Sequence, residues 1–86
     1  MELTKEQKER ANNVIKNLCQ IDDENITDET QFSSDLGLDG LDMVELIMEI
    51  EAEFSMLIPD ENYDNIETVK ELYGVIATQL KAKNNY

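Results

Sequence analysis

The chain has 86 residues, enough for one small domain, which we expect to span residues 1–86. Its 20 acidic residues outnumber its 7 basic residues and give a formal net charge of −13, which excludes nucleic acids as partners because contacts to phosphates need Lys and Arg. The chain has no His, so Ser-His-Asp and Cys-His catalysis are excluded, and no apolar run approaches the roughly 20 residues of a membrane span.

A first helix is predicted to begin near Thr4, because Thr4 and Gln7 have the spacing of a capping box. It should end by about residue 20. Its apolar residues follow the i, i+3, i+4, i+7 pattern of a helix with one buried face, and they are Ala11, Val14, Ile15 and Leu18. Cys19 lies at the end of this segment, and we expect it to be a half-buried, unreactive thiol.

A long connection follows, from about residue 20 to residue 38, rich in Asp, Asn and Thr. Connections of this length without regular structure are uncommon in small domains, so the length needs a structural reason. We expect the connection to be held against the helices by its apolar side chains, which are Ile21, Ile26, Phe32, Leu36 and Leu38.

A second helix is predicted from about Leu41 to Ser55. Its apolar residues spread over more than one face, which is more apolar surface than a helix packed on one side requires. They are Leu41, Met43, Val44, Leu46, Ile47, Met48, Ile50 and Phe54. Pro59 then breaks the helical pattern and holds Ile58 extended, and a short helical turn is expected at about residues 60–65.

The last helix is expected to start with Thr68 as its cap and Glu71 three residues later. Lys81 and Lys83 would complement the dipole at its end, and its inward stripe comprises Val69, Leu72, Tyr73, Ile76 and Leu80. No segment alternates polar and apolar residues as a strand would. The predicted fold is therefore all-α: a four-helix bundle with three main helices, one short helix and a long loop between the first two.

The start of the second helix combines several features of a binding site. A helix N-terminus there offers unpaired N–H groups and a partial positive charge, which suit a phosphate, while Gly37 and Gly40 allow close approach. No basic residue occurs between Asn17 and Val69, so the acidic helix favours docking to basic patches of partners over a merely solvated face. The predicted docking residues are Asp39, Leu41, Asp42, Met43, Glu45, Met48 and Glu49.

A calcium-binding EF-hand loop is an alternative at this junction, because Asp35, Asp39 and Gly40 fall at loop positions one, five and six. Position three would be Gly37, and position twelve would be Leu46, where the motif needs a bidentate Glu. We therefore predict no dedicated metal site. Weak binding of divalent cations to the acidic helix stays open.

From about residue 3 to residue 80 the chain resembles the acyl carrier proteins of the discrete bacterial type. The resemblance rests on two motifs at a fixed distance, Leu36-Gly37-x-Asp39-x-Leu41-Asp42 and Ile58-Pro59-Asp60. It implies a carrier and not an enzyme. In this family a serine carries phosphopantetheine from coenzyme A, and the thiol of that arm holds acyl groups as thioesters for fatty acid biosynthesis or related polyketide and lipid pathways. The resemblance places this attachment position at Gly40, between Asp39 and Leu41.

The resemblance also implies partners and a pocket. The partners would be phosphopantetheinyl transferase and acyl-transferring or synthase enzymes, each presenting basic patches. Family members shelter the acyl chain between their helices, and the matching residues, any of which would also serve as ordinary core, are Val44, Leu46, Ile47, Phe54, Ile58, Ile66, Leu72 and Ile76. We expect a monomer, and a cytoplasmic setting because a single cysteine cannot form an internal disulfide and the N-terminus lacks the apolar core of a signal peptide.

Gly40 departs from the family because it lacks the side-chain oxygen that a phosphodiester needs. As written, the chain should not accept the arm. Three explanations stay open: a serine replaced deliberately, a misassigned residue, or a natural family member that kept the docking surface and lost the cargo. Intact Asp39 and Leu41 favour the first two. The third would be a cargo-free interaction or regulatory module, and an acidic calcium-responsive bundle is a further rival.

Overall fold

The computed structural model describes residues 2–59 and 66–84. Its helices are α1 (Lys5–Cys19), the short 3-10 helix η1 (Asp23–Asn25), α2 (Gly40–Phe54) and α4 (Val69–Asn84). Within these ranges there is no strand, only an isolated bridge between Gln31 and Thr68. The predicted all-α fold with three main helices is confirmed. The short helix predicted at residues 60–65 lies outside the described residues.

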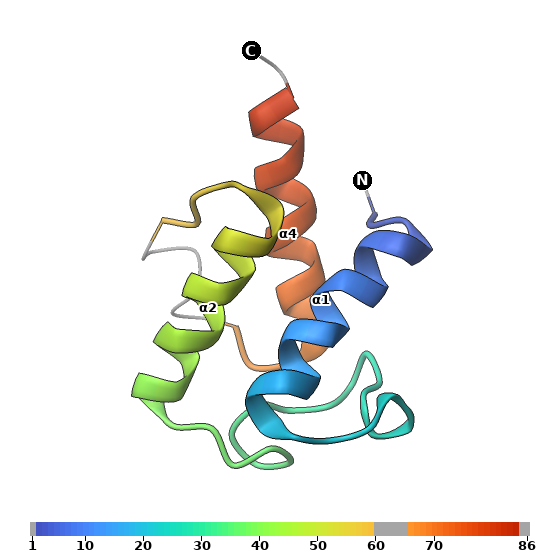
Figure 1. Ribbon diagram of the computed structural model, residues 1–86, viewed down its shortest axis with the longest axis vertical. Helices are drawn as coiled ribbons and strands as arrows, with labels where there is room; N and C mark the ends of the chain where they lie inside the picture. Colours follow the sequence, from blue (N-terminus) through green and yellow to red (C-terminus); the bar gives the residue numbers. More distant parts are fainter. Residues whose placement is uncertain (1, 60–65, 85–86) are drawn as a thin grey trace.

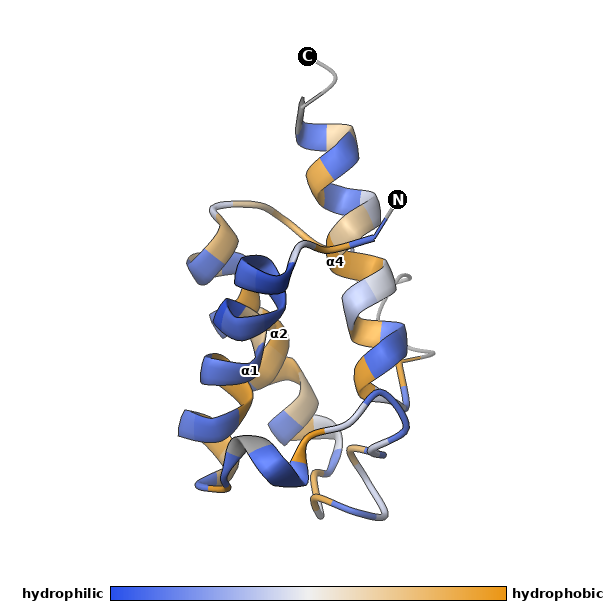
Figure 2. Ribbon diagram, turned by 90° about the vertical axis from the view of Figure 1, so that its right-hand side faces the viewer, coloured by the Kyte–Doolittle hydropathy of each residue, from blue (hydrophilic) through white to orange (hydrophobic). Residues whose placement is uncertain are grey.

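The first helix begins as its sequence predicts. The Thr4 hydroxyl accepts from the Gln7 backbone N–H at 3.1 Å, and the Gln7 side-chain oxygen accepts from the Thr4 N–H at 2.9 Å. These two bonds satisfy donors that the first turn of a helix leaves unpaired. Figure 2 shows hydrophilic residues along the outer side of α1, whereas α2 is largely hydrophobic.

The three main helices pack around one apolar core (Figure 1). Helix α4 lies between and behind α1 and α2, and the long loop runs below them from the end of α1 to the start of α2. The largest fully buried side chains come from all three helices and from this loop, and they are Phe32, Ile15, Leu46, Ile47, Ile50, Leu72, Ile76 and Val69. The core therefore includes the loop as a structural element.

The long loop is fixed by hydrogen bonds to the segment that precedes α4. The Phe32 N–H donates to the Glu67 carbonyl at 2.8 Å, and the Val69 N–H donates to the Thr30 carbonyl at 3.0 Å. Thr30 and Phe32 are both buried, and the other apolar loop residues pack against the core while partly exposed. The expectation that the loop is held against the helices is confirmed. Its length is needed to reach α4 before it turns back to α2.

The start of α4 also follows the prediction. The Thr68 hydroxyl accepts from the Glu71 backbone N–H at 3.2 Å, and the Glu71 carboxylate accepts from the Thr68 N–H at 2.9 Å. The same carboxylate accepts from the Glu67 N–H at 3.0 Å and from the Thr68 hydroxyl at 3.1 Å. These hydrogen bonds to its charged form lower the pKa of Glu71 below its usual range.

Candidate functional site

Helix α2 begins with a capping box that uses two carboxylates. Asp39 has extended backbone angles, and its side chain accepts from the Asp42 N–H at 2.9 Å. The Asp42 carboxylate accepts in return from the Asp39 N–H at 3.1 Å. The helix predicted from about Leu41 therefore begins one residue earlier, at Gly40, within the bounds that the prediction gave. The bonds orient both carboxylates at the positive end of the helix dipole, where negative charge is favoured.

The loop that leads into α2 turns at Gly37, which has a φ of +70°. Residues with a Cβ rarely adopt this backbone conformation. The Asp35 carboxylate accepts from the Gln31 N–H at 2.8 Å, which holds the turn in place. Asp35 and Asp39 are thus both used as backbone acceptors. Among residues 2–59 and 66–84, no group of three or more His, Cys, Asp or Glu side chains is placed to hold a metal ion.

Gly40 is the first residue of α2 and is exposed to solvent. A Cβ built at this position meets no heavy atom within 4 Å. Its φ lies outside the left-handed region, so a residue with a side chain fits the backbone without strain. A serine would therefore be tolerated here, and its hydroxyl would lie beside the free N–H groups of the helix N-terminus.

The outer surface of α2 is both acidic and apolar. Leu41 is 81% exposed and Met48 is 62% exposed. Asp39, Glu45 and Glu49 are exposed beside them, and Asp42 is half-buried. The helix has no basic residue of its own. The structure thus brings most of the predicted docking residues onto one exposed helix.

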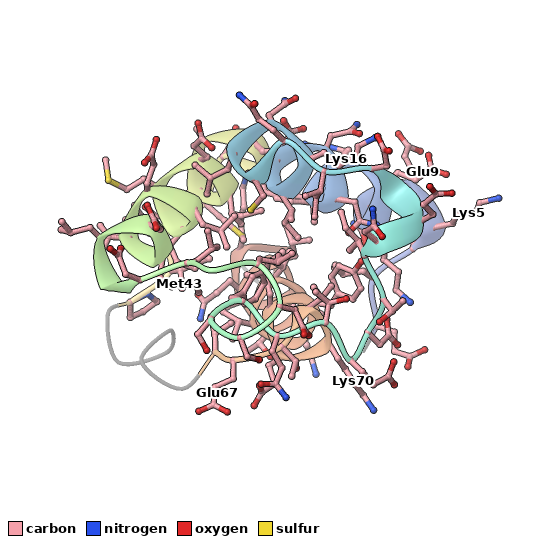
Figure 3. All side chains as sticks on the ribbon, turned by 90° about the horizontal axis from the view of Figure 1, so that it is seen from below. Lys5, Glu9, Lys16, Met43, Glu67 and Lys70 are labelled. Carbon is pink, nitrogen blue, oxygen red and sulfur yellow. The ribbon has the colours of Figure 1, made fainter. Side chains whose placement is uncertain are left out.

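Two neighbouring residues of α2 are placed differently from the other members of their predicted sets, while their predicted roles stay predictions. Met43 was predicted to lie on the docking surface, but it is half-buried and packs against the core, near the long loop (Figure 3). Val44 was predicted to lie in the acyl pocket, but it is 41% exposed and lies outside the core. The buried residues of α2 are Leu46, Ile47, Ile50 and Phe54, so residue 43 continues the i, i+3, i+4, i+7 face and residue 44 leaves it.

The other residues predicted to form an acyl pocket are buried in a single core. They come from α2, from the segment after it and from α4, and they are Leu46, Ile47, Phe54, Ile58, Ile66, Leu72 and Ile76. Helix packing has brought together residues that lie up to 30 positions apart in the sequence. Because they already pack against one another, an acyl chain would have to displace them.

The C-terminal end of α2 is held by side chains from both other helices. From α1, the Arg10 Nε donates to the Glu53 carboxylate at 2.8 Å, and the guanidinium lies 4.5 Å from the centre of the Phe54 ring. From α4, the Lys83 Nζ donates to the Ser55 carbonyl at 2.7 Å. Lys83 was predicted to complement the dipole of its own helix. It lies in the last turn of α4, as predicted, and its Nζ also supplies positive charge to the C-terminus of α2, where cations are favoured.

Leu57 is 80% exposed, and the sequence analysis missed it. The chain leaves α2 extended, with Met56 and Ile58 buried on either side of Leu57. The Ile58 N–H donates to the Glu51 carboxylate at 2.7 Å, which fixes this segment. Since neighbouring side chains of an extended chain point to opposite sides, burying Met56 and Ile58 forces Leu57 outward. The sequence contained a signal for this exposure: three consecutive apolar residues, Met56 to Ile58, lie between the end of a helix and Pro59, and an extended chain cannot bury all three on one side.

The single cysteine lies at the end of α1, where its half-buried position is confirmed. Burial raises the pKa of the Cys19 thiol, and the nearby Asp42 carboxylate raises it further. Both effects disfavour the thiolate, which is the reactive form.

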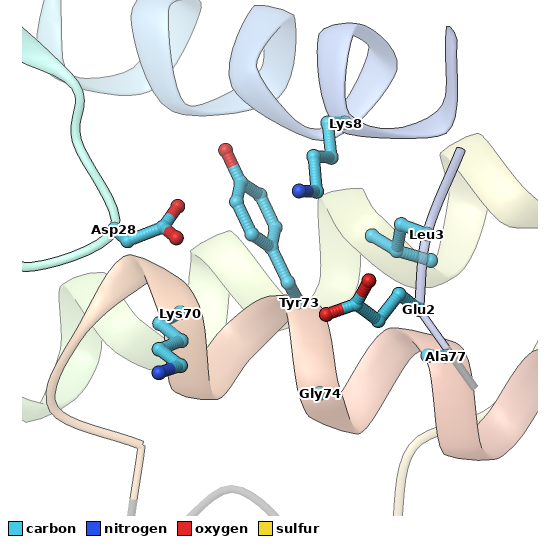
Figure 4. Close-up of a pocket in the computed structure, with 8 residues that line it drawn as sticks. All are labelled: Glu2, Leu3, Lys8, Asp28, Lys70, Tyr73, Gly74 and Ala77. Atoms are coloured by element: carbon cyan, nitrogen blue, oxygen red, sulfur yellow. The ribbon is translucent and has the colours of Figure 1, made fainter. Parts of the chain in front are cut away.

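A hollow of about 160 Å³ lies between the N-terminal segment, α1 and α4 (Figure 4). The Lys8 ammonium lies 5.5 Å from the centre of the Tyr73 ring, and the Tyr73 hydroxyl donates to the Asn12 side chain. Glu2, Asp28 and Lys70 carry further charges at its rim. None of the residues predicted to bind cofactor, partner or acyl chain lines this hollow.

No helix in the described part of the chain is long and apolar enough to cross a membrane.

The chain is similar to known proteins that belong to one family. Residues 11–76 match the family described as "Phosphopantetheine attachment site". An acyl carrier protein from Chlorobium phaeobacteroides is 45% identical over 69 residues, which cover 80% of this chain and 88% of that protein. Acyl carrier protein 2, mitochondrial, from Arabidopsis thaliana is 39% identical over 75 residues. That alignment covers 87% of this chain but 60% of the plant protein's length.

The fold is also similar to a solved structure. A protein from Mycobacterium tuberculosis assigned as an acyl carrier protein superposes with a TM-score of 0.77 at 33% identity. The match covers 84% of this chain and 96% of the other.

Proposed function

Because the chain belongs to the acyl carrier protein family, whose members are carriers and not enzymes, we propose that it is a carrier scaffold for fatty acid biosynthesis with residue 40 as its attachment position. The family implies phosphopantetheine as the group that holds the acyl chain. Its attachment would need a side-chain oxygen at residue 40, which Gly40 lacks. The chain with glycine is therefore an unloaded form of such a carrier.

The observation that supports this proposal most is the surroundings of Gly40. The residue opens α2, is exposed, and has open space where a side chain would project. Asp39 and Leu41 flank it, one as the helix cap and the other as a largely exposed apolar side chain. A serine hydroxyl there would be accessible to a transferase, and its phosphodiester would lie at the helix N-terminus, where anions are favoured.

Intact-mass measurement after incubation with a phosphopantetheinyl transferase and coenzyme A tests the attachment position. The chain with Gly40 should gain no mass, and Gly40→Ser should gain the mass of one arm. Gly40→Ala is the matched control, because it adds a Cβ at the same place without an oxygen. Failure of Gly40→Ser to load would contradict the carrier proposal, and loading of the glycine chain would contradict the assignment of residue 40.

The acidic surface of α2 supports enzymes with basic patches as partners. Opposite charges steer such partners into contact and lose their effect as salt screens them. We place the transferase and the acyl-transferring or synthase enzymes on this surface, with the chain acting as a single-domain monomer in the cytoplasm. The buried residues of the core would shelter the acyl chain once it displaces them.

One observation favours a second function. Residue 40 has no side-chain oxygen for attachment, yet the acidic and apolar surface of α2 beside it is exposed. A natural protein with these features would be a cargo-free regulatory module that binds carrier-dependent enzymes and blocks them. The codon for residue 40 in the natural gene decides between the two: a serine codon excludes the module, and a glycine codon favours it.

A further inference from the structure

The large exposed hydrophobic residues of the described chain all lie on α2 or just beyond its end. They are Leu41, Val44, Met48 and Leu57. In residues 2–59 and 66–84, neither α1 nor α4 carries one. Scattered exposed apolar side chains need no explanation, whereas a contiguous set of them, rimmed by polar residues, marks an interaction surface.

These residues form a continuous strip along α2. Leu41, Val44 and Met48 follow the i, i+3, i+7 spacing of one helix face, and the same face continues through Ala52 and Ser55. Leu57 borders a hollow together with Ala52 and Ser55, so it extends the strip past the helix end. With a rise of about 1.5 Å per residue, the helical part is roughly 20 Å long.

Leu57 projects between two hollows from a segment that hydrogen bonds hold on either side. The one on the α2 side is a shallow, open depression, and the one toward α4, lined by Pro59, Ala82 and Lys83 among others, has a volume of about 330 Å³. The backbone on either side is held by the Lys83 bond to Ser55 and the Glu51 bond to Ile58. Because the backbone beside Leu57 is held in place, binding a partner would cost little conformational entropy in this segment.

We propose that Leu57 is a second anchor for the enzymes that act at residue 40, an inference that rests on the proposed function. Such an enzyme presents an apolar strip long enough to contact both ends of α2, with Lys or Arg residues beside it. Charge complementarity selects this occupant, because carboxylates such as Glu45 and Glu49 accompany the strip and α2 has no basic residue. A second copy of the chain, with a net charge of −13, would be repelled.

The loading rate of Gly40→Ser by phosphopantetheinyl transferase and coenzyme A tests the anchor. Adding Leu57→Ser should lower kcat/KM about fivefold to tenfold through KM, as expected for losing one apolar contact. Leu57→Met should lower kcat/KM less than Leu57→Ser does, because methionine keeps an apolar side chain of similar size. Leu57→Lys should load more slowly than Leu57→Glu, because the partner surface is cationic. Leu41→Ser, nearer the reacting residue, should also slow loading.

The control is Thr78→Ala, an exposed position on α4, a helix that carries none of the large exposed hydrophobic residues, and it should load at the rate of its Gly40→Ser parent. Thermal melting should be unchanged by the Leu57 substitutions, because that side chain is exposed. If Gly40→Ser does not load at all, the proposed function and the anchor both fail. If it loads and Leu57→Ser loads equally fast, or Leu57→Glu is slower than Leu57→Lys, the anchor alone is overturned.

Discussion

The two ends of α2 are stabilised in different ways. At its N-terminal end, the carboxylates of Asp39 and Asp42 each accept a hydrogen bond from the backbone N–H of the other residue. Leu41 and Val44 face solvent there. At its C-terminal end, Phe54 is buried, Arg10 reaches across from α1, and Lys83 reaches across from α4. Local hydrogen bonds cap the N-terminal end, whereas side chains from two other helices reach the C-terminal end.

This difference shows how one helix can serve both stability and access. A site that other proteins must reach needs an exposed face, and exposure reduces the packing that would otherwise hold that part of the helix. The clamped C-terminal end compensates by fixing the direction of the helix. The capping box then keeps the first turn helical, and because it uses only residues of that turn, the surface around residue 40 stays accessible.

The largest effect should come from the packed end. Phe54→Ala removes a buried aromatic ring and should lower the free energy of unfolding by about 3–5 kcal/mol. Leu41→Ala at the exposed end should change it by less than about 0.5 kcal/mol. Urea unfolding followed by circular dichroism measures both. Since Phe54→Ala can approach the whole stability of a small domain, Phe54→Leu serves as a milder variant. Equal losses at the two ends would contradict the comparison.

The capping box should account for most of the stability of the first turn of α2. Asp39→Ala removes the side chain that accepts from the Asp42 N–H, and it should cost about 1 kcal/mol. Asp39→Asn keeps a side-chain acceptor and should cost less. Amide hydrogen exchange should become faster for residues 41–44 and stay unchanged near Phe54. Faster exchange along the whole helix would show that its two ends are not independent.

The Arg10 contact should be worth about 1 kcal/mol, because its ion pair with Glu53 is partly solvated and its stacking on Phe54 is modest. The two side chains of the pair are 41% and 39% exposed. Arg10→Met keeps the apolar stem and should lower the unfolding free energy by roughly this amount. A double-mutant cycle with Glu53→Gln separates the ion pair from the stacking. A coupling energy near zero would mean that the pair does not hold this end.

The smallest effect should be the pH dependence contributed by the Glu71 cap of α4, a locally capped helix start like that of α2. Its pKa is lowered in the folded state, so the unfolded chain binds the proton more tightly. The cap therefore stabilises the fold fully above the ordinary glutamate pKa of about 4.3 and loses this effect as the pH falls through the lowered folded-state pKa. Glu71→Gln should flatten unfolding free energy against pH in that range. An unchanged slope would exclude this contribution.

Local spacing in the sequence determined most of the fold. The caps of α1 and α4 were predicted from residues three positions apart, and the buried faces followed from the 3.6-residue period. The start of α2 was also placed correctly, because Asp-Gly-Leu follows a polar loop and precedes a periodic apolar segment. These features depend on residues within one or two turns of each other, so the sequence alone contains them.

Only the tertiary structure decided which apolar residues of α2 face outward. Met43 and Val44 are adjacent, and each belongs to an apolar stripe with helical spacing, so the sequence alone did not show which stripe packs inward. The rotation of α2 against α1, α4 and the loop placed Met43 inside and Val44 outside. Burial of Met56 and Ile58 exposed Leu57, and the Lys83 ammonium donates to the Ser55 carbonyl at the end of α2. Each of these outcomes depends on contacts between distant segments, which a local pattern does not encode.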